Sequence, residues 1–253
     1  MNKRGKNRGL KEICLVIAII FLSIAMIVFF AKNVYAADPE GPGSITIISN
    51  ETKATTSAQV INISGGYIAN INITATIQNP RWKAFVGNVL GSFTLADASG
   101  AQIYDWTFST TTGRIYATRN SSFVTWSQIN CSNATTLEAE NSALSHTSAN
   151  DNLTSTFNIT NGATHSSFYV GNRQIAANRC PTLNTYIGNN TQDSDFEEMA
   201  LYDGYNIVYA TILENNLGGY DDTNYDFQMI VPERGDPGFT GATAYYLYIE
   251  IGT

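Results

Sequence analysis

The sequence predicts an all-β fold: a β-sandwich of short antiparallel strands, with one short helix in a long polar excursion. Three observations predict it. Apolar and polar residues alternate over short stretches, as they do in a strand with one buried face. These stretches are rich in β-branched and aromatic residues, which suit a pleated, half-buried surface. Turn residues such as Asp97-Ala98-Ser99-Gly100 and Asp203-Gly204 separate them at the spacing typical of sandwich strands.

The first predicted strands follow a Pro/Gly-rich linker at residues 37–43. They are Ser44–Ser49, Ala58–Ser64 and Tyr67–Ile77, and Gly65-Gly66 between the last two reads as a hairpin turn. The first of these strands either pairs within its own domain or is donated to the open edge of a neighbouring molecule.

The later strands share this composition and complete a single domain over residues 44–253. They are predicted at Ala84–Leu95, Ala101–Phe108, Arg114–Thr118, Ser122–Trp126, Leu153–Ile159, Ser167–Gly171, Thr182–Ile187, Phe196–Tyr202, Tyr205–Leu213, Tyr225–Val231 and Ala242–Ile251. Helical character is confined to Ala134–Leu144, inside the polar excursion of residues 127–165.

The N-terminus has the layout of an export signal. Basic residues dominate residues 1–12, an uncharged and mostly apolar run covers Ile13–Ala31, and Val34-Tyr35-Ala36-Ala37 follows. A basic region, an apolar region and small residues before the cut are typical of a secretory signal. We therefore expect residues 1–36 to be a signal peptide, cut after Ala36, and the rest to be extracellular or at the cell surface.

Two alternatives remain open at this end. The apolar run is long enough to span a bilayer, so residues 13–31 could stay as a membrane anchor. In addition, Arg8-Gly9-Leu10-Lys11-Glu12-Ile13 resembles an archaeal type IV prepilin signal, which is cut after the glycine and would leave residues 10–31 as the core helix of a pilin-like subunit. Lys11 departs from that motif. In each case the basic end stays in the cytoplasm.

Charge excludes several classes of partner. Residues 37–253 hold eight basic and twenty acidic residues, a net charge of −12 against −7 for the whole chain. Nucleic-acid binding needs a basic footprint, which is missing. Docking on anionic lipid is disfavoured for the same reason, so membrane contact is expected only through an uncleaved residues 13–31.

Two cysteines remain after the signal, Cys131 and Cys180. Exported compartments permit disulfides, and this pair would close a loop worth roughly 3–4 kcal/mol in the chain-entropy model. The alternative is two free thiols. Without a Cys-x-x-Cys pair, a zinc or redox site is not expected.

Asn-x-Ser/Thr glycosylation acceptors occur nine times: Asn50, Asn62, Asn72, Asn120, Asn130, Asn133, Asn152, Asn158 and Asn189. Asn62 and Asn72 lie within predicted strands, where only an outward-facing side chain could be modified.

No catalytic motif is present, and we predict neither an enzyme nor a required cofactor. His146 and His165 lie in polar sequence typical of solvated loops. The rival hypothesis is a glycosidase that uses two of the many carboxylates after residue 192. Structural calcium is a second use for them, on loop oxygens of Asp193, Asp195, Asp221 and Asp222, although EF-hand spacing is absent. The plainer interpretation is a solvated acidic face.

Four stretches carry a resemblance: Gln78–Val89, Phe93–Gly100, Ile103–Trp106 and Tyr225–Pro232. In them the chain resembles a group of uncharacterised exported archaeal cell-surface proteins, over most of residues 37–253. Because that group has no assigned activity, the resemblance implies lineage and export and transfers no site. In architecture, the predicted sandwich also resembles secreted subunits that polymerise by lending a strand.

These observations predict a secreted or cell-surface structural or adhesive glycoprotein without catalytic activity, which packs against itself or other envelope components. The alternatives are a carbohydrate- or calcium-binding surface module and the pilin-like subunit.

Overall fold

The computed structural model describes residues 37–108, 110–158, 162–188 and 191–252. The chain divides into two units, residues 1–37 and residues 38–253, and the second is described below. The predicted export signal at residues 1–36 lies outside the described residues. Within those residues, no helix combines the length and apolarity needed to cross a membrane.

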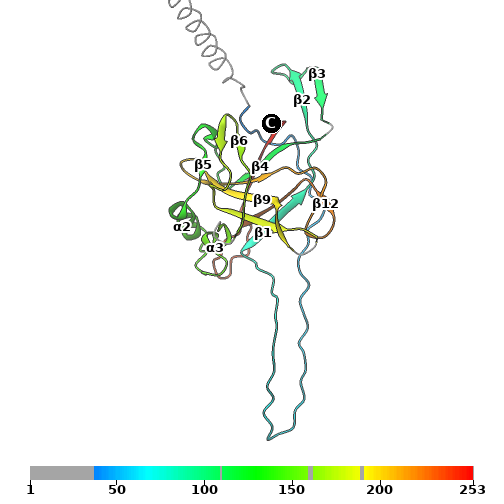
Figure 1. The fold of residues 1–253 in the computed structure, drawn as a ribbon, viewed down its shortest axis with the longest axis vertical. Coiled ribbons are helices and arrows are strands. Elements are labelled where there is room, and N and C mark those ends of the chain that lie inside the picture. The colour runs from blue at the N-terminus through cyan, green and yellow to red at the C-terminus, as the bar shows by residue number, and fades with distance from the viewer. Residues whose placement is uncertain (1–36, 109, 159–161, 189–190, 253) are drawn as a thin grey trace, which may run out of the picture. The chain divides into compact units, whose positions relative to one another are not determined.

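A six-stranded antiparallel sheet forms the centre of the fold (Figure 1). Its strands run in the order β14-β4-β10-β9-β5, and β8 also pairs with β9. Their bounds are β4 Gly113–Thr118, β5 Asn130–Cys131, β8 Thr182–Tyr186, β9 Gln192–Tyr202, β10 Ile207–Ile212 and β14 Tyr246–Ile251. The all-β prediction is thereby confirmed.

Both faces of the central sheet are covered, because its strands carry apolar residues at successive positions. In β4, Ile115 and Ala117 face one core cluster and Tyr116 faces the other. Strand β1 (Trp82–Gly87) pairs with β13 (Phe227–Pro232), and this pair packs on the first face together with the helices. The β6–β7 hairpin packs on the second face.

Three smaller pairs complete the strands. They are β2 (Ser92–Ala96) with β3 (Gln102–Thr107), β6 (Phe168–Val170) with β7 (Arg173–Ile175), and β11 (Leu217–Gly218) with β12 (Asn224–Tyr225). The predicted strand Ala84–Leu95 is thus two elements, because β1 ends at Gly87 and the chain leaves the sheet before β2. The predicted strand Ser122–Trp126 is also wrong: that segment leads into a 3-10 turn, η1 (Trp126–Gln128), and buries Trp126.

Among the described residues of the polar excursion, two helices are present rather than one. Helix α2 (Ala134–Ala143) matches the prediction, whereas α3 (Leu153–Thr156) replaces a predicted strand. The reason is local: the Asn152 side chain accepts a hydrogen bond from Ser155 N and caps the turn. Leu153 is then buried against the sheet.

The predicted disulfide is present. Cys131 and Cys180 are bonded, with their Cα atoms 4.7 Å apart. The bond joins β5, near the start of the polar excursion, to Cys180, which lies two residues before β8 and is fully buried. The excursion is therefore tied to the sheet at its start, as expected for an elaborated loop of one domain.

The N-terminal part of the unit differs most from expectation. Of the predicted linker, Pro39 is buried and Glu40 pairs with Ile249 of β14 through two backbone hydrogen bonds of 3.0 and 2.7 Å. The three strands predicted over residues 44–77 are wrong as strands of this sheet, because these residues form no ladder.

Candidate functional site

We call residues 44–78 the arm and the rest of residues 38–253 the body. All 35 arm residues are exposed, and none belongs to a helix or strand. A single backbone hydrogen bond joins two residues within the arm, from Tyr67 N to Ser64 O at 3.4 Å, at the predicted Gly65-Gly66 turn. The arm is therefore an extended excursion whose backbone groups face water.

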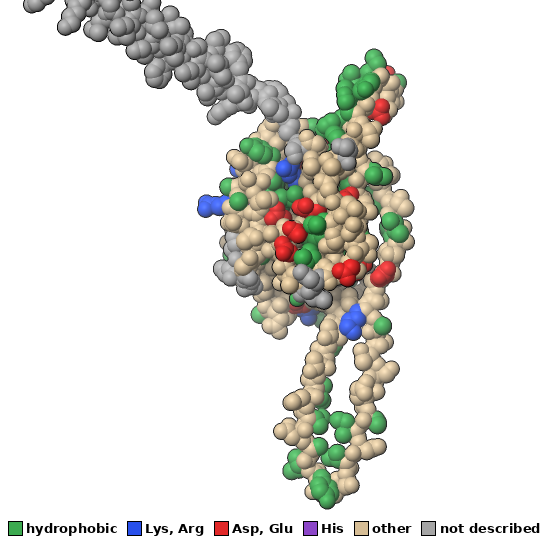
Figure 2. All heavy atoms as spheres, turned by 45° about the vertical axis from the view of Figure 1, so that its right-hand side comes forward, with side chains coloured by type: hydrophobic (Ala, Val, Ile, Leu, Met, Phe, Trp, Pro, Cys, Tyr) green, Lys and Arg blue, Asp and Glu red, His purple; other side chains and the backbone are tan. Residues whose placement is uncertain are grey.

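Apolar side chains are concentrated on this excursion. Ile48 is 93% exposed and Ile68 is 100% exposed. The other exposed large apolar residues of the arm are Ile45, Ile47, Val60, Ile61, Ile63, Tyr67, Ile71, Ile73 and Ile77. Figure 2 shows hydrophobic side chains along the arm, whereas acidic side chains gather on the visible face of the body. Single exposed apolar residues are ordinary, but a contiguous set marks an interaction surface.

The arm sequence separates two faces. In an extended chain, successive side chains point to opposite sides. Most arm isoleucines have odd numbers: Ile45, Ile47, Ile61, Ile63, Ile71, Ile73 and Ile77. The acceptors Asn50, Asn62 and Asn72 have even numbers. A strand formed by residues 58–64 or by residues 67–78 would therefore bury isoleucines on one face and present a glycan acceptor on the other.

Both ends of the arm are fixed to the body. Glu40 is held at β14, and at the other end Asn79 Nδ2 and Arg81 Nη1 each donate to the Asp151 carboxylate at 2.9 Å. Trp82 Nε1 donates to the Asp151 carbonyl oxygen at 2.8 Å. The arm thus leaves a rigid base, and its unpaired N–H and C=O groups are a template for pairing with another strand.

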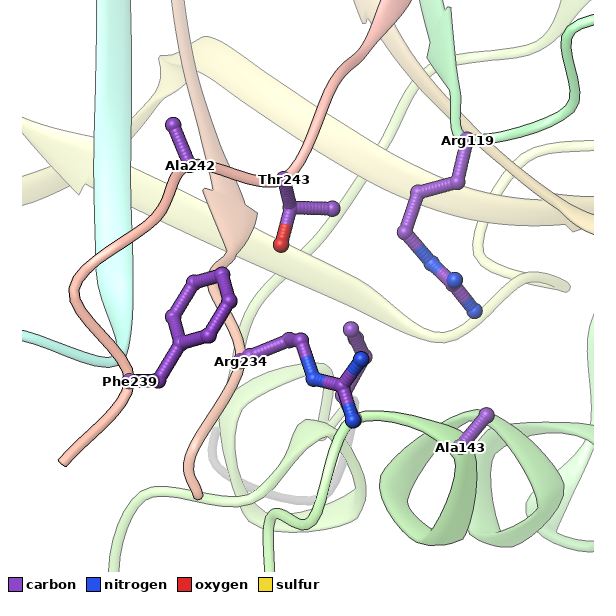
Figure 3. A pocket seen from close by; sticks show the side chains of 7 residues that line it. Arg119, Ala143, Arg234, Phe239, Ala242 and Thr243 are labelled. Atoms are coloured by element: carbon purple, nitrogen blue, oxygen red, sulfur yellow. The ribbon is translucent and has the colours of Figure 1, made fainter. Parts of the chain in front are cut away.

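A pocket of about 290 Å³ lies between α2 and the segment before β14 (Figure 3). Its lining residues are Arg119, Ala143, Leu144, Arg234, Phe239, Ala242 and Thr243. Two arginines beside an aromatic ring are chemically suited to a small anion.

The charges of that pocket are already matched. Arg119 makes two hydrogen bonds to the Glu140 carboxylate, at 2.7 and 2.6 Å. Arg234 Nε donates to Asp236 at 2.6 Å, and its guanidinium lies 5.6 Å from the centre of the Phe239 ring. An anion would compete with both carboxylates. Because no Asp or Glu lines the pocket, it offers no carboxylate pair for glycoside hydrolysis.

The acidic C-terminal quarter is not simply a solvated face. Glu198 is fully buried, and its carboxylate accepts a hydrogen bond from Ile230 N at 2.8 Å. Burial raises the pKa of Glu198 well above its usual value. Burial, with the charges of Asp195 and Glu197, raises the pKa of Glu214 to about 7. These carboxyls lie in or beside packed strands, so their perturbed pKa values reflect structure rather than a cleft.

The four aspartates considered for calcium are not gathered. Among the described residues, no group of three or more His, Cys, Asp or Glu side chains is placed to hold a metal ion. Asp193 accepts a hydrogen bond from Asp195 N, whereas Asp221 accepts from Thr223 N and from Tyr225 Oη. Asp222 lies in a turn with φ +66°. The calcium hypothesis therefore gains no support from these positions.

The expectation of solvated loop histidines is wrong, because both histidines are buried. His165 Nε2 accepts hydrogen bonds from Arg179 N and Cys180 N, at 2.9 and 3.1 Å. Its Nδ1 lies 2.7 Å from Ser166 O. The ring is thus the neutral Nδ1–H tautomer and joins two loops next to the disulfide, and burial lowers its pKa. Polar neighbours in the sequence gave no signal of this bridging role.

The described glycosylation acceptors are all at least partly exposed: Asn50, Asn62, Asn72, Asn120, Asn130, Asn133, Asn152 and Asn158. Asn189 lies outside the described residues. Asn133 and Asn152 cap α2 and α3 through Oδ1, which leaves Nδ2, the atom that carries a glycan, away from the cap. Asn120 instead donates through Nδ2 to Phe123 O at 2.9 Å, so a glycan there would break a turn contact.

Comparison with known protein families, curated proteins and solved structures gave no match. Function must therefore be argued from the site itself. In the described structure the arm is the largest exposed apolar segment, and packing within one molecule does not explain it.

Proposed function

We propose that this chain is an exported cell-surface subunit, structural or adhesive and without a catalytic role, which assembles with further copies of itself through the arm. The observation that carries the proposal is the arm: 35 exposed residues in extended form, rich in isoleucine and without a ladder partner. Unpaired extended backbone with a regular apolar face is what strand addition between molecules requires.

Export and glycosylation belong to the same proposal. The basic and apolar N-terminus, the disulfide and the nine acceptors are mutually consistent outside the cytoplasm. Because most arm isoleucines have odd numbers and the arm acceptors have even numbers, glycans would lie on the face opposite the buried isoleucines.

The test of assembly is the size of the purified chain of residues 37–253 as a function of concentration, by analytical ultracentrifugation. The mean size of the complexes should increase with protein concentration, to the same extent with and without calcium. A monomer at every concentration, with and without calcium, would refute self-assembly. Growth only with calcium would favour the metal-binding alternative.

The test of export is the mass of the native N-terminal peptide. Cleavage after Ala36 predicts a chain that begins at Ala37. A chain that begins at Leu10 would establish the pilin-like alternative, and an intact Met1 in the membrane fraction would establish the anchor.

A further inference from the structure

The β2–β3 hairpin has one apolar and one polar face. Residues directly opposite each other in an antiparallel pair share a face. Phe93 lies opposite Trp106, and Leu95 lies opposite Tyr104. The alternate pairs are polar and join Ser92 with Thr107 and Thr94 with Asp105. Ile103, at the register shift next to Leu95, is 80% exposed and stands outside this pattern. Four large apolar side chains therefore stand together on one side of two strands.

That apolar face is about half exposed, with the Phe93 ring packed against Phe108 at 4.6 Å between ring centres. Phe93 is 45% exposed, Leu95 56%, Tyr104 60% and Trp106 49%. Every residue of both strands is exposed. A hairpin of two strands is marginally stable by itself in water, and a third strand with a shared apolar face changes that. A third strand that covers part of this apolar face would therefore stabilise the hairpin.

The edge of β3 is open to such a strand. Among the described residues, β3 pairs only with β2, so its outer N–H and C=O groups have no ladder. The second run of the arm, residues 67–78, has the complementary pattern. Ile71, Ile73 and Ile77 alternate with polar or small residues, and the acceptor Asn72 lies on the opposite face.

We propose that residues 67–78 of one copy add as a strand to the open β3 edge of a second copy. Ile71 and Ile73 then extend the face of Tyr104 and Trp106, and Asn72 lies on the polar side with Asp105. This inference rests on the proposed function and names the surface that accepts the arm.

The positions of the arm and the β2–β3 hairpin favour a contact between two copies over a contact within one molecule. Figure 1 shows the arm and the β2–β3 hairpin leaving opposite ends of the body. Strand β1 lies between them in the chain, after the arm and before the hairpin. A donor at one end and an acceptor at the other make a head-to-tail contact, which produces rings or filaments.

Charge agrees with this arrangement. The arm carries Glu51 and Lys53 as its only charged residues, so its net charge is zero. Residues 37–253 together carry −12. A neutral donor can approach an acidic neighbour without the repulsion that two acidic bodies would meet.

The experiment uses two variants of residues 37–253. The donor variant carries Ile71→Thr, Ile73→Thr and Ile77→Thr, and the acceptor variant carries Tyr104→Thr and Trp106→Thr. Threonine keeps strand propensity and removes the apolar surface. Each variant alone should need a concentration about tenfold or more above wild type to assemble. Ile48→Thr with Val60→Thr is the control on the arm outside residues 67–78, and Thr94→Ser is the control on the polar face of β2, away from the β3 edge; both should assemble as wild type does.

Mixing the two variants gives the sharpest result. One keeps an intact acceptor and the other an intact donor, so the mixture should stop at dimers of one copy of each. If the acceptor variant assembles normally and the donor variant does not, the β3 contact is overturned, but assembly through the arm still stands. Normal assembly by both would overturn the role of residues 67–78 as well. An unchanged melting temperature of each dispersed variant shows that the body remains folded.

Discussion

The body and the arm use the same residue types to opposite ends. In the body, apolar residues follow each other directly along β4 and β10, and both faces of the central sheet are buried. In the arm, isoleucine alternates with asparagine and threonine, and no side chain is buried. The comparison teaches that alternation predicts a strand but does not say in which molecule its partner lies.

The largest expected change in the free energy of unfolding comes from the disulfide, which constrains the body and not the arm. Replacing both partners, Cys131→Ala with Cys180→Ala, should lower the free energy of unfolding by about 4 kcal/mol, from the loop closed between residues 49 apart. Urea unfolding followed by tryptophan fluorescence measures it. An unchanged midpoint would mean that the excursion is held by packing alone.

A matched pair of isoleucine truncations sharpens the contrast. Ile129 is fully buried in the core and Ile68 is fully exposed on the arm. Ile129→Ala should lower the free energy of unfolding by roughly 2–5 kcal/mol through lost burial and a residual cavity. Ile68→Ala should change it by less than about 0.5 kcal/mol in the dispersed monomer. Comparable losses at the two positions would show that the arm folds onto its own body.

The dependence of stability on pH should also belong to the body. The folded pKa of Glu214, about 7, lies above its usual 4.5. The folded state therefore binds more protons than the unfolded state between these values, and the free energy of unfolding falls as pH rises from about 4.5 to about 7. Glu214→Gln should make this fall shallower and add about 1 kcal/mol at pH 8, after allowance for partial exposure. Unfolding measured at pH 4, 6 and 8 tests it; an unaltered slope would contradict it.

The smallest expected effect on stability distinguishes the two roles of Asn133, as a helix cap and as a glycan acceptor. Asn133 caps α2 and receives a hydrogen bond from Thr136 N at 3.0 Å. Asn133→Ala should cost about 1 kcal/mol even in unglycosylated protein. Thr135→Ala removes the same acceptor and keeps the cap, so it should leave the stability of unglycosylated protein nearly unchanged. Equal losses in the two variants would deny Asn133 its capping role.

Sequence patterns located most body strands because those strands bury regular faces. Strand β10 lies within its predicted range, β9 ends where predicted but begins four residues earlier at Gln192, and α2 matches within one residue. Prediction failed where a single polar contact overrides propensity, as at Asn152, or where polar residues are buried, as at His165 and Glu198. The contacts of His165 and Glu198 leave no local pattern, because their partners lie elsewhere in the chain. The Asn152 cap is local, with Ser155 three residues on, but strand propensity was given more weight there.

The arm was the instructive failure. Its alternation correctly indicated extended backbone with one apolar face, but periodicity contains no information about the partner. The hairpin face of Phe93, Leu95, Tyr104 and Trp106 became visible only once the β2–β3 register was known. Both parts of the inferred contact thus needed the structure.

The central claim is that the arm finds its strand partner in another molecule. Hydrogen–deuterium exchange of residues 67–78 tests it directly, compared between dispersed and assembled protein of residues 37–253. Unpaired amides exchange rapidly, whereas amides in a ladder are protected. The account predicts rapid exchange in the monomer and at least about a hundredfold slower exchange in the assembly, as for amides opened against a few kcal/mol. Equal exchange in both states would contradict it.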